Sequence, residues 1–171
     1  MDIALLVLRV VIGLALAAHG SQKLFGWFGG GGLKGTHGFI DMLGFRPSRF
    51  WAPVVAVGEF GGGLLMAIGL LNPIGPLAIV ASMLTATWTA HRSKGFWNSN
   101  GGYELPLTNI AVAVAVALAG SGRWSLDSLF GIALPESAVI TLTVLTLVGV
   151  VAGLASRRRQ ERPAAAARTA A

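Results

Sequence analysis

The sequence contains no cysteine. This absence excludes disulfides, thiolate catalysis and every zinc, haem or iron–sulfur site that needs a cysteine ligand. Charged residues are also scarce, because they make up 12% of the 171 residues, against about 25% in soluble domains. Hydrophobic residues make up 54%. Too little polar surface is left to cover a small globular body, so the composition predicts a protein whose solvent is lipid.

Five hydrophobic segments have the character of membrane-spanning helices, which need about 20 residues to cross roughly 30 Å of hydrocarbon. They cover residues 3–24, 52–71, 74–90, 105–120 and 137–155. We therefore predict an all-α integral membrane protein, with a four-helix transmembrane bundle over residues 1–131 and an additional transmembrane helix over residues 132–156. The remaining segment, residues 157–171, is basic, and we expect a disordered cytoplasmic tail.

The basic residues gather on one side of this arrangement. A net charge of +6 would by itself suit a nucleic-acid partner. If the N-terminus lies outside, however, eleven of the 13 Lys and Arg residues fall on the inner side, and the other two are Arg123 outside and Arg9 within the first span. This distribution is the positive-inside bias of a multi-pass inner-membrane protein, so no nucleic-acid partner is predicted.

A glycine run follows the first hydrophobic segment. Residues 30–35 match the pattern G-x-G-x-x-G, but a dinucleotide site needs a buried strand before that pattern, and here a hydrophobic helix precedes it. We interpret the glycines as the point where the chain leaves the first helix and turns along the membrane. Beyond them, Thr36 is predicted to cap a short interfacial helix that ends at Gly44.

Two charged residues stand inside predicted spans. At 100° per residue, Arg9 shares a face of the first helix with Gly13 and Gly20, which predicts a face turned toward other helices. The alternative is that Arg9 extends to the outer headgroups. Glu59 lies among glycines in the second span, where a carboxylate must be protonated or paired with a cation, for which Arg9 and Lys23 are the candidates. Glu59 is therefore either a structural ion-pair partner or a functional carboxylate.

Further polar residues collect at the inner ends of the predicted helices. They are His19, Gln22, Lys23, Trp88, His91, Tyr103, Glu104 and Asn109. We predict a polar layer shared by four helices, although interfacial residues also mark places where helices simply end. The three histidines include no pair spaced three or four residues apart, so no metal site is predicted, and a haem held by two of them is the weaker alternative.

The sequence resembles the DoxX family of small bacterial membrane proteins. Four segments carry the resemblance in order: residues 5–30 with Arg9, residues 32–45, residues 58–71 with Glu59, and residues 95–107 with Glu104. The resemblance implies a four-helix bundle in the bacterial inner membrane, to which the fifth hydrophobic segment is an addition. It also implies an oxidoreductase or an oxidoreductase subunit, because relatives are associated with thiosulfate:quinone oxidoreductase and with oxidative-stress responses.

Three functional hypotheses follow. The first is a quinone-linked membrane oxidoreductase component, in which Glu59, His19 and His91 are the catalytic candidates that exchange protons with the ring oxygens. The candidate cofactor-binding residues are Arg9, Lys23, Trp88, Trp97, Glu104 and Asn109. The second hypothesis is a non-catalytic membrane scaffold for soluble redox enzymes, and the third is a small transporter. Besides lipid, the expected partners are soluble redox enzymes at the cytoplasmic face and a second copy of the chain.

The charge distribution makes a testable prediction about orientation. A reporter fused after Ala171 should be active only if it is a cytoplasmic marker, because the basic residues hold the loops of that side in the cytoplasm. Activity of a periplasmic reporter at the same position would contradict both the orientation and the fifth span.

Overall fold

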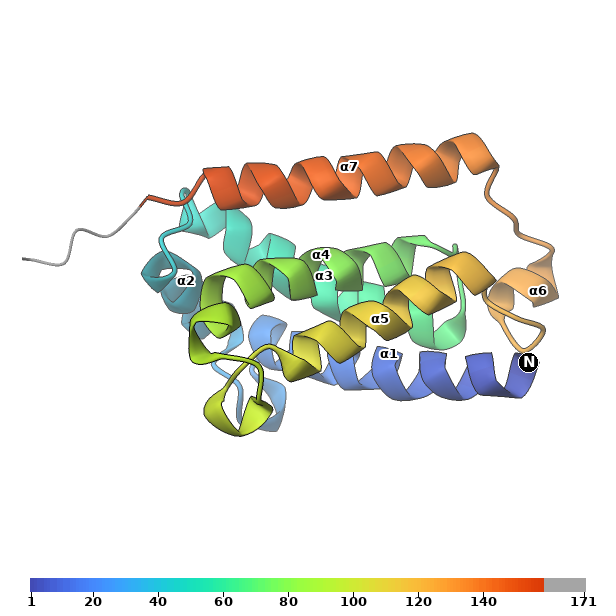
Figure 1. Cartoon of the computed structure of the whole chain (residues 1–171), viewed down its shortest axis with the longest axis horizontal. Coiled ribbons are helices and arrows are strands. Elements are labelled where there is room, and N and C mark those ends of the chain that lie inside the picture. The colour runs from blue at the N-terminus through green and yellow to red at the C-terminus, as the bar shows by residue number, and fades with distance from the viewer. Residues whose placement is uncertain (159–171) are drawn as a thin grey trace, which may run out of the picture.

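The computed structural model describes residues 1–158, and within this range the chain forms helices and no strand (Figure 1). Three helices are long and apolar enough to cross a membrane: α1 (Asp2–Leu24), α3 (Ser48–Ile68) and α7 (Glu136–Ala155). The others are α2 (Gly32–Met42), α4 (Ile74–Ala86), which continues as a π-helical turn over Thr87–His91, α5 (Glu104–Ala119) and α6 (Leu126–Phe130). The predicted all-α membrane fold is thereby confirmed.

The predicted hydrophobic segments and the helices agree closely, with three differences. In place of the second segment, residues 52–71, α3 begins four residues earlier at Ser48 and ends three residues earlier at Ile68. In the third segment, α4 changes to π-helical geometry after Ala86. With 16 residues, α5 is about 24 Å long at 1.5 Å per residue, which is short for a bilayer. The number of helices that cross the membrane therefore stays a prediction.

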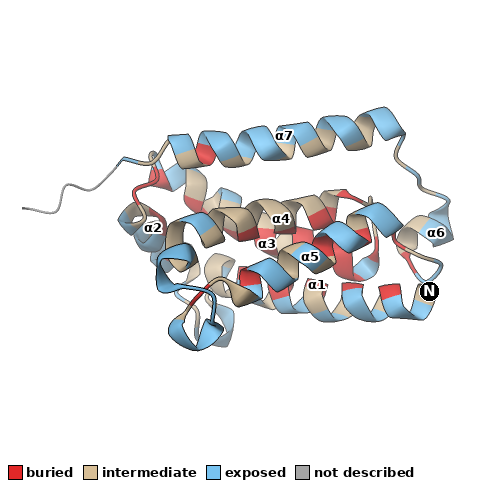
Figure 2. Ribbon diagram, viewed as in Figure 1, coloured by how far each residue is buried: buried red, intermediate tan, exposed pale blue. Residues whose placement is uncertain are grey.

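Helices α1, α3, α4 and α5 lie side by side, and α7 packs on the outside of this group along α4 (Figure 1). The most extensive packing joins α1 to α3, and α4 packs between α3 and α5. Helix α2 covers one end of the bundle, and α6 lies at the other end. In α7 the only buried residue is Gly153, and the rest of the helix is largely exposed in Figure 2. The division into a core and a separate C-terminal helix stays a prediction.

The contact between α1 and α3 depends on glycine. A Cβ atom at Gly20 would lie 2.2 Å from the backbone nitrogen of Phe60, and one at Gly63 would lie 2.5 Å from that of Ala17. No rotamer change relieves such a clash, because the atoms are backbone. The predicted inward face of α1 is confirmed, since Arg9, Gly13 and Gly20 are all buried.

The glycine run makes a turn, as predicted. Gly26 and Gly29 have φ angles of 80° and 78°, a region that other residues rarely adopt, and the chain reverses there into α2. The predicted cap is wrong, because α2 begins at Gly32 and Thr36 lies inside it. The Thr36 hydroxyl instead donates to the carbonyl oxygen of Lys23 at 2.9 Å, one of the carbonyls that α1 leaves unpaired at its end.

Arg9 lies at the α6 end of the bundle, which we call the Arg9 end. Its side chain is 1% exposed, and its guanidinium donates to the carbonyl oxygens of Trp124 at 2.6 Å and Ala67 at 3.4 Å. The alternative in which Arg9 extends to the headgroups is therefore wrong. Asp127 completes this end by accepting hydrogen bonds from the backbone of Leu71 at 2.7 Å and Asn72 at 3.0 Å.

The beginning of the predicted tail is attached to the bundle. Arg157 donates from Nε to the carbonyl oxygen of Leu43 at 2.8 Å, and the backbone nitrogen of Arg158 donates to the carbonyl oxygen of Gly44 at 2.9 Å. The predicted disorder of the remaining tail lies outside the described residues.

The helix crossing generates a prediction with a matched control. Gly63→Ala should lower the free energy of unfolding in detergent by at least about 2 kcal/mol, because its methyl group meets the backbone of α1. Gly61 lies two residues away on the same helix and faces the other side. The methyl group of Gly61→Ala meets no atom within 4 Å, so this substitution should be neutral or stabilising by roughly 0.5–1 kcal/mol. Equal effects of the two substitutions on thermal melting would contradict the crossing.

Candidate functional site

A cavity of about 370 Å³ lies at the end of the bundle opposite Arg9. Its walls come from α1 to α5 and from the loop before α5, and most of the lining is apolar. Five of the residues predicted for the site line it: His19, Lys23, Glu59, His91 and Asn109. We call it the Lys23–Glu59 cavity. Part of the predicted polar layer therefore lines one cavity, and the roles of its residues stay predictions.

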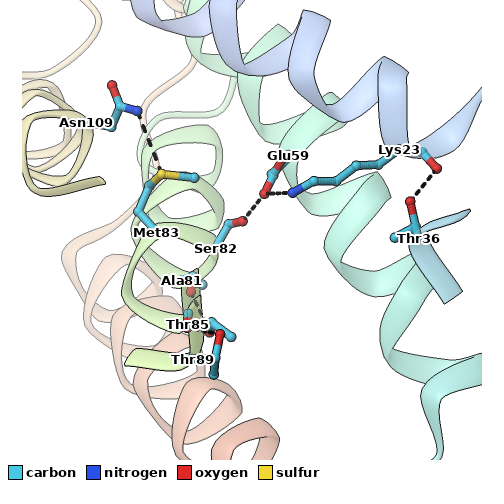
Figure 3. A network of polar contacts seen from close by, with 9 residues as sticks. All are labelled: Lys23, Thr36, Glu59, Ala81, Ser82, Met83, Thr85, Thr89 and Asn109. Atoms are coloured by element: carbon cyan, nitrogen blue, oxygen red, sulfur yellow. Dashed lines mark hydrogen bonds and ion pairs between the residues drawn. The ribbon is translucent and has the colours of Figure 1, made fainter. Parts of the chain in front are cut away.

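Glu59 is the most buried charged group of this cavity, with 1% of its side chain exposed. Its Oε1 atom accepts from Lys23 Nζ at 2.5 Å and from the Ser82 hydroxyl at 2.5 Å (Figure 3). Its Oε2 atom is buried and has no hydrogen-bond partner among the described residues. The carboxylate therefore has one oxygen held by protein and one buried oxygen without a partner, on a residue that lines the cavity.

The sequence places these three side chains by helix geometry. Lys23 stands in the last turn of α1, and the glycine crossing brings that turn against the middle of α3, where Glu59 lies. Ser82 comes from α4, the other neighbour of α3. Of the two cations considered for Glu59, Lys23 is the partner. Arg9 is 14 residues away from Lys23 along α1, about 21 Å at 1.5 Å per residue.

His91 is positioned by the π-helical turn that ends α4. Its Nδ1 atom lies 2.7 Å from the carbonyl oxygen of Gly101. A carbonyl oxygen only accepts, so Nδ1 carries the hydrogen, and in the neutral ring Nε2 is left as a proton acceptor. Single π-helical turns of this kind are common at functional sites.

The other polar groups of the cavity keep some bonding capacity. The Asn109 amide has a long contact of 3.7 Å to Met83 Sδ, and Thr85 and Thr89 donate at 2.8 Å to carbonyls of their own helix, which leaves their oxygens as acceptors (Figure 3). His19 is exposed on α1 at the edge of the cavity. The cavity therefore offers both donors and acceptors on an apolar background.

Four predicted site residues do not line this cavity. Arg9 lies at the opposite end of the bundle, and Trp88 is 56% exposed with the Arg92 guanidinium 4.1 Å above its ring. Trp97 is 63% exposed, and Glu104 accepts a hydrogen bond at 2.9 Å from the backbone of Asn98. Glu104 thereby orders the loop that closes the cavity and that supplies Asn98 to its lining.

Sequence reasoning missed Ser82 and a second polar cluster. At the start of α3, the Ser48 hydroxyl lies 2.9 Å from Asp41 Oδ1 and 3.0 Å from His37 Nε2, and Arg46 pairs with the same carboxylate. The hydrogen bond from Ser48 and the charge of Arg46 lower the pKa of Asp41. Because the carboxylate contacts serine and not imidazole, this is not a nucleophilic triad, and the cluster ties α2 to α3.

Residues 1–158 include no group of three His, Asp or Glu side chains placed to hold a metal ion. The chemistry that the cavity supports is therefore described by its acids, bases and amides.

Comparison with known proteins gives consistent matches. A family model described as DoxX matches residues 4–92. The protein named "Putative oxidoreductase CatD" of Bacillus subtilis (strain 168) is 33% identical over 127 residues, which are 74% of this chain and 86% of that protein. "Inner membrane protein YqjF" of Escherichia coli (strain K12) is 25% identical over 128 residues, which are 75% of this chain and 92% of that protein. No solved structure matches the chain.

The ion pair predicts energetic coupling between α1 and α3. Lys23→Met and Glu59→Gln should each lower the free energy of unfolding by about 3 kcal/mol, because each leaves a partly or fully buried group without its partner. The double variant should lose at least about 1 kcal/mol less than the sum of the two. Thermal melting in detergent measures the cycle, with Arg9→Met and Glu59→Gln as the control pair, whose effects should add. Additive effects for Lys23 and Glu59 would show that the pair contributes nothing.

Proposed function

We propose a function that starts from the family: this chain belongs to the DoxX family of membrane proteins. In this proposal its Lys23–Glu59 cavity binds a quinone or a related lipophilic redox molecule. The chain would then be the quinone-binding, proton-exchanging component of an oxidoreductase in the bacterial inner membrane. One relative is named as a putative oxidoreductase and another as an inner membrane protein, and together these names support a redox function within a membrane.

The observation that carries this proposal is the unpartnered Oε2 atom of Glu59. A carboxylate oxygen only accepts hydrogen bonds, so a group that satisfies it must be a donor. A buried polar atom without a partner costs about 1–3 kcal/mol, and a ligand that supplies the missing bond recovers this free energy. The hydroxyl group of a quinol is a donor carried by a mostly apolar ring, which suits a cavity with a mostly apolar lining.

The oxidised ring needs the opposite kind of contact, because its oxygens only accept. The cavity has donors for them in the Lys23 ammonium, which has three N–H groups and gives one to Glu59, and in the amide of Asn109. Both forms of the ring therefore find partners in one site. A site for a redox carrier needs this property, since it must accept one form and release the other.

A bound quinone supplies the redox chemistry, since it takes up two electrons and two protons to become the quinol. The residues of this chain handle the protons. As a carboxylate Glu59 accepts one proton when the quinol is oxidised, and it returns that proton when the quinone is reduced; Lys23 stabilises the deprotonated form of Glu59, and the Nε2 atom of His91 is a second acceptor. Apolar side chains such as Leu16 and Ile40 keep bulk water away from the ring.

Electrons must enter from another protein, because without cysteine the chain has no thiol couple of its own. We assign this role to a soluble redox enzyme at the Lys23 end of the bundle. The distribution of basic residues supports an orientation in which that end faces the cytoplasm, with a multi-pass topology and a cytoplasmic C-terminus.

The test is to purify the protein, extract it with organic solvent and look for quinone by mass spectrometry, followed by binding of a soluble benzoquinol. Glu59→Gln should weaken binding of the benzoquinol by about tenfold or more, because it removes a hydrogen bond to a charged acceptor. The matched control is Glu136→Gln, which removes a carboxylate from an exposed position at the start of α7. Binding is measured below the melting temperature of each variant.

A protein that neither retains quinone nor binds the benzoquinol would overturn the proposal. If such a protein carried soluble redox enzymes through purification, the scaffold hypothesis would take its place. Equal weakening by Glu59→Gln and Glu136→Gln would also contradict the role of Oε2.

A further inference from the structure

A second cavity, of about 280 Å³, lies between α7 and the pair formed by α3 and α4. Its lining is almost entirely apolar, and we call it the α7 groove. Four residues line both it and the Lys23–Glu59 cavity: Phe45, Val55, Ser82 and Thr85. Ser82 is also the residue that donates to Glu59. The groove and the cavity therefore meet at a shared wall, directly beside the buried carboxylate.

The groove exists because α7 is held near one end and stands off along its middle. At the held end, Gly153 lies against the ring of Trp51, where a Cβ atom would approach to 3.3 Å, and Arg157 bonds the carbonyl oxygen of Leu43. Farther along, Gly149 on α7 and Gly58 on α3 both line the groove, and a Cβ atom at either would meet no atom within 4 Å. The two facing helices are therefore not in van der Waals contact at these positions.

We propose that the α7 groove holds the hydrocarbon tail of the ligand whose polar ring lies in the Lys23–Glu59 cavity. This inference rests on the proposed function and specifies the class of ligand: a ring with oxygen substituents that carries a long apolar chain. The ligand enters sideways from the bilayer beneath α7, and its tail stays in the groove while its ring reaches Glu59.

The occupant follows from where the groove leads. A free lipid chain would need only an apolar surface, whereas the lining of this groove includes Ser82 and Thr85, two hydroxyl residues that it shares with the polar cavity. A molecule that fills both spaces must be apolar along most of its length and polar at one end. A quinone has this form, with a polar ring for the cavity and an apolar tail for the groove.

The groove contributes access to the cavity more than affinity. Moving an alkyl chain from lipid into an apolar groove gains little free energy, because lipid tails are as apolar as the side chains. Filling the groove should therefore act by exclusion: it should block a ligand that has a tail and leave a ligand without a tail unaffected.

The experiment compares two probes on the full-length protein in lipid nanodiscs. One is a dimethoxy-methyl-benzoquinol with a ten-carbon alkyl chain, and the other is the same ring without the chain. Gly58→Leu and Gly149→Leu should each weaken binding of the tailed probe by about tenfold or more, through steric overlap in the groove. Binding of the tailless probe should change by less than about twofold.

The chain offers a matched control for each variant. Gly61→Leu adds the same side chain to α3 where a Cβ atom also meets nothing within 4 Å, but Gly61 does not line the groove. Ala152→Leu introduces a leucine at an exposed position of α7 that does not line the groove. Neither control should alter binding of either probe. Thermal melting of all four variants verifies that they fold.

The outcomes separate this inference from the function on which it rests. If the unaltered protein binds neither probe, the proposed function fails and this inference fails with it. If both probes bind and the groove variants change the affinity for both by the same factor, the tail does not occupy the groove, while the cavity remains a quinol site. If Gly58→Leu abolishes binding of both probes, the new side chain has disturbed the neighbouring Glu59. The result for Gly149→Leu, which lies on α7, then decides whether the tail occupies the groove.

Discussion

Glu59 carries a carboxylate into a place where neither lipid nor water solvates it, and the surrounding helices are arranged around that constraint. Its cation, Lys23, belongs to another helix and reaches it at 2.5 Å because the backbones of α1 and α3 touch at glycines. A methyl group at Gly20 would press on Phe60, the residue next to Glu59, and move the two charges apart. The ion pair and the glycine crossing therefore depend on each other, and together they fix the register of the bundle.

The same problem, a charge inside an apolar bundle, has a different solution at the Arg9 end. There the guanidinium bonds backbone carbonyls and is so closely packed that a Cβ atom at Gly69 would lie 1.9 Å from it. Nothing larger than a hydrogen atom fits beside that nitrogen. Each end keeps one buried polar atom without a hydrogen-bond partner among the described residues, Arg9 Nε at one end and Glu59 Oε2 at the other, but the Lys23–Glu59 pair also borders a cavity of about 370 Å³. One end of the bundle is thus built to hold helices together, and the other has room and bonding capacity for a ligand.

Hydropathy was sufficient to predict the five hydrophobic helices, though not the short helix α6. Depth along the helices placed His19, Lys23 and His91 at one level, and these residues line one cavity together with Glu59. Depth alone could not decide between Arg9 and Lys23 as the partner of Glu59, because that choice depends on how α1 and α3 cross. A single hydroxyl in an apolar run carries little information, so Ser82 was missed. The two tryptophans near the site face outward, since an aromatic ring at a helix end suits lipid headgroups as well as a cavity.

Helix α7 lies beyond residues 4–92, which the family model matches, and it buries only Gly153. Its own packing therefore contributes little to holding the bundle together. Its effect is on the surface of α3 and α4 that it covers. Gly58 and Ser82 lie on the surface that α7 covers, and with α7 in place they line a groove whose walls also include Trp51 and Gly149. Under the proposal that this groove holds the tail of the ligand, α7 decides which molecules can reach Glu59, and it does so without contributing to the Lys23–Glu59 pair, whose residues lie on α1 and α3.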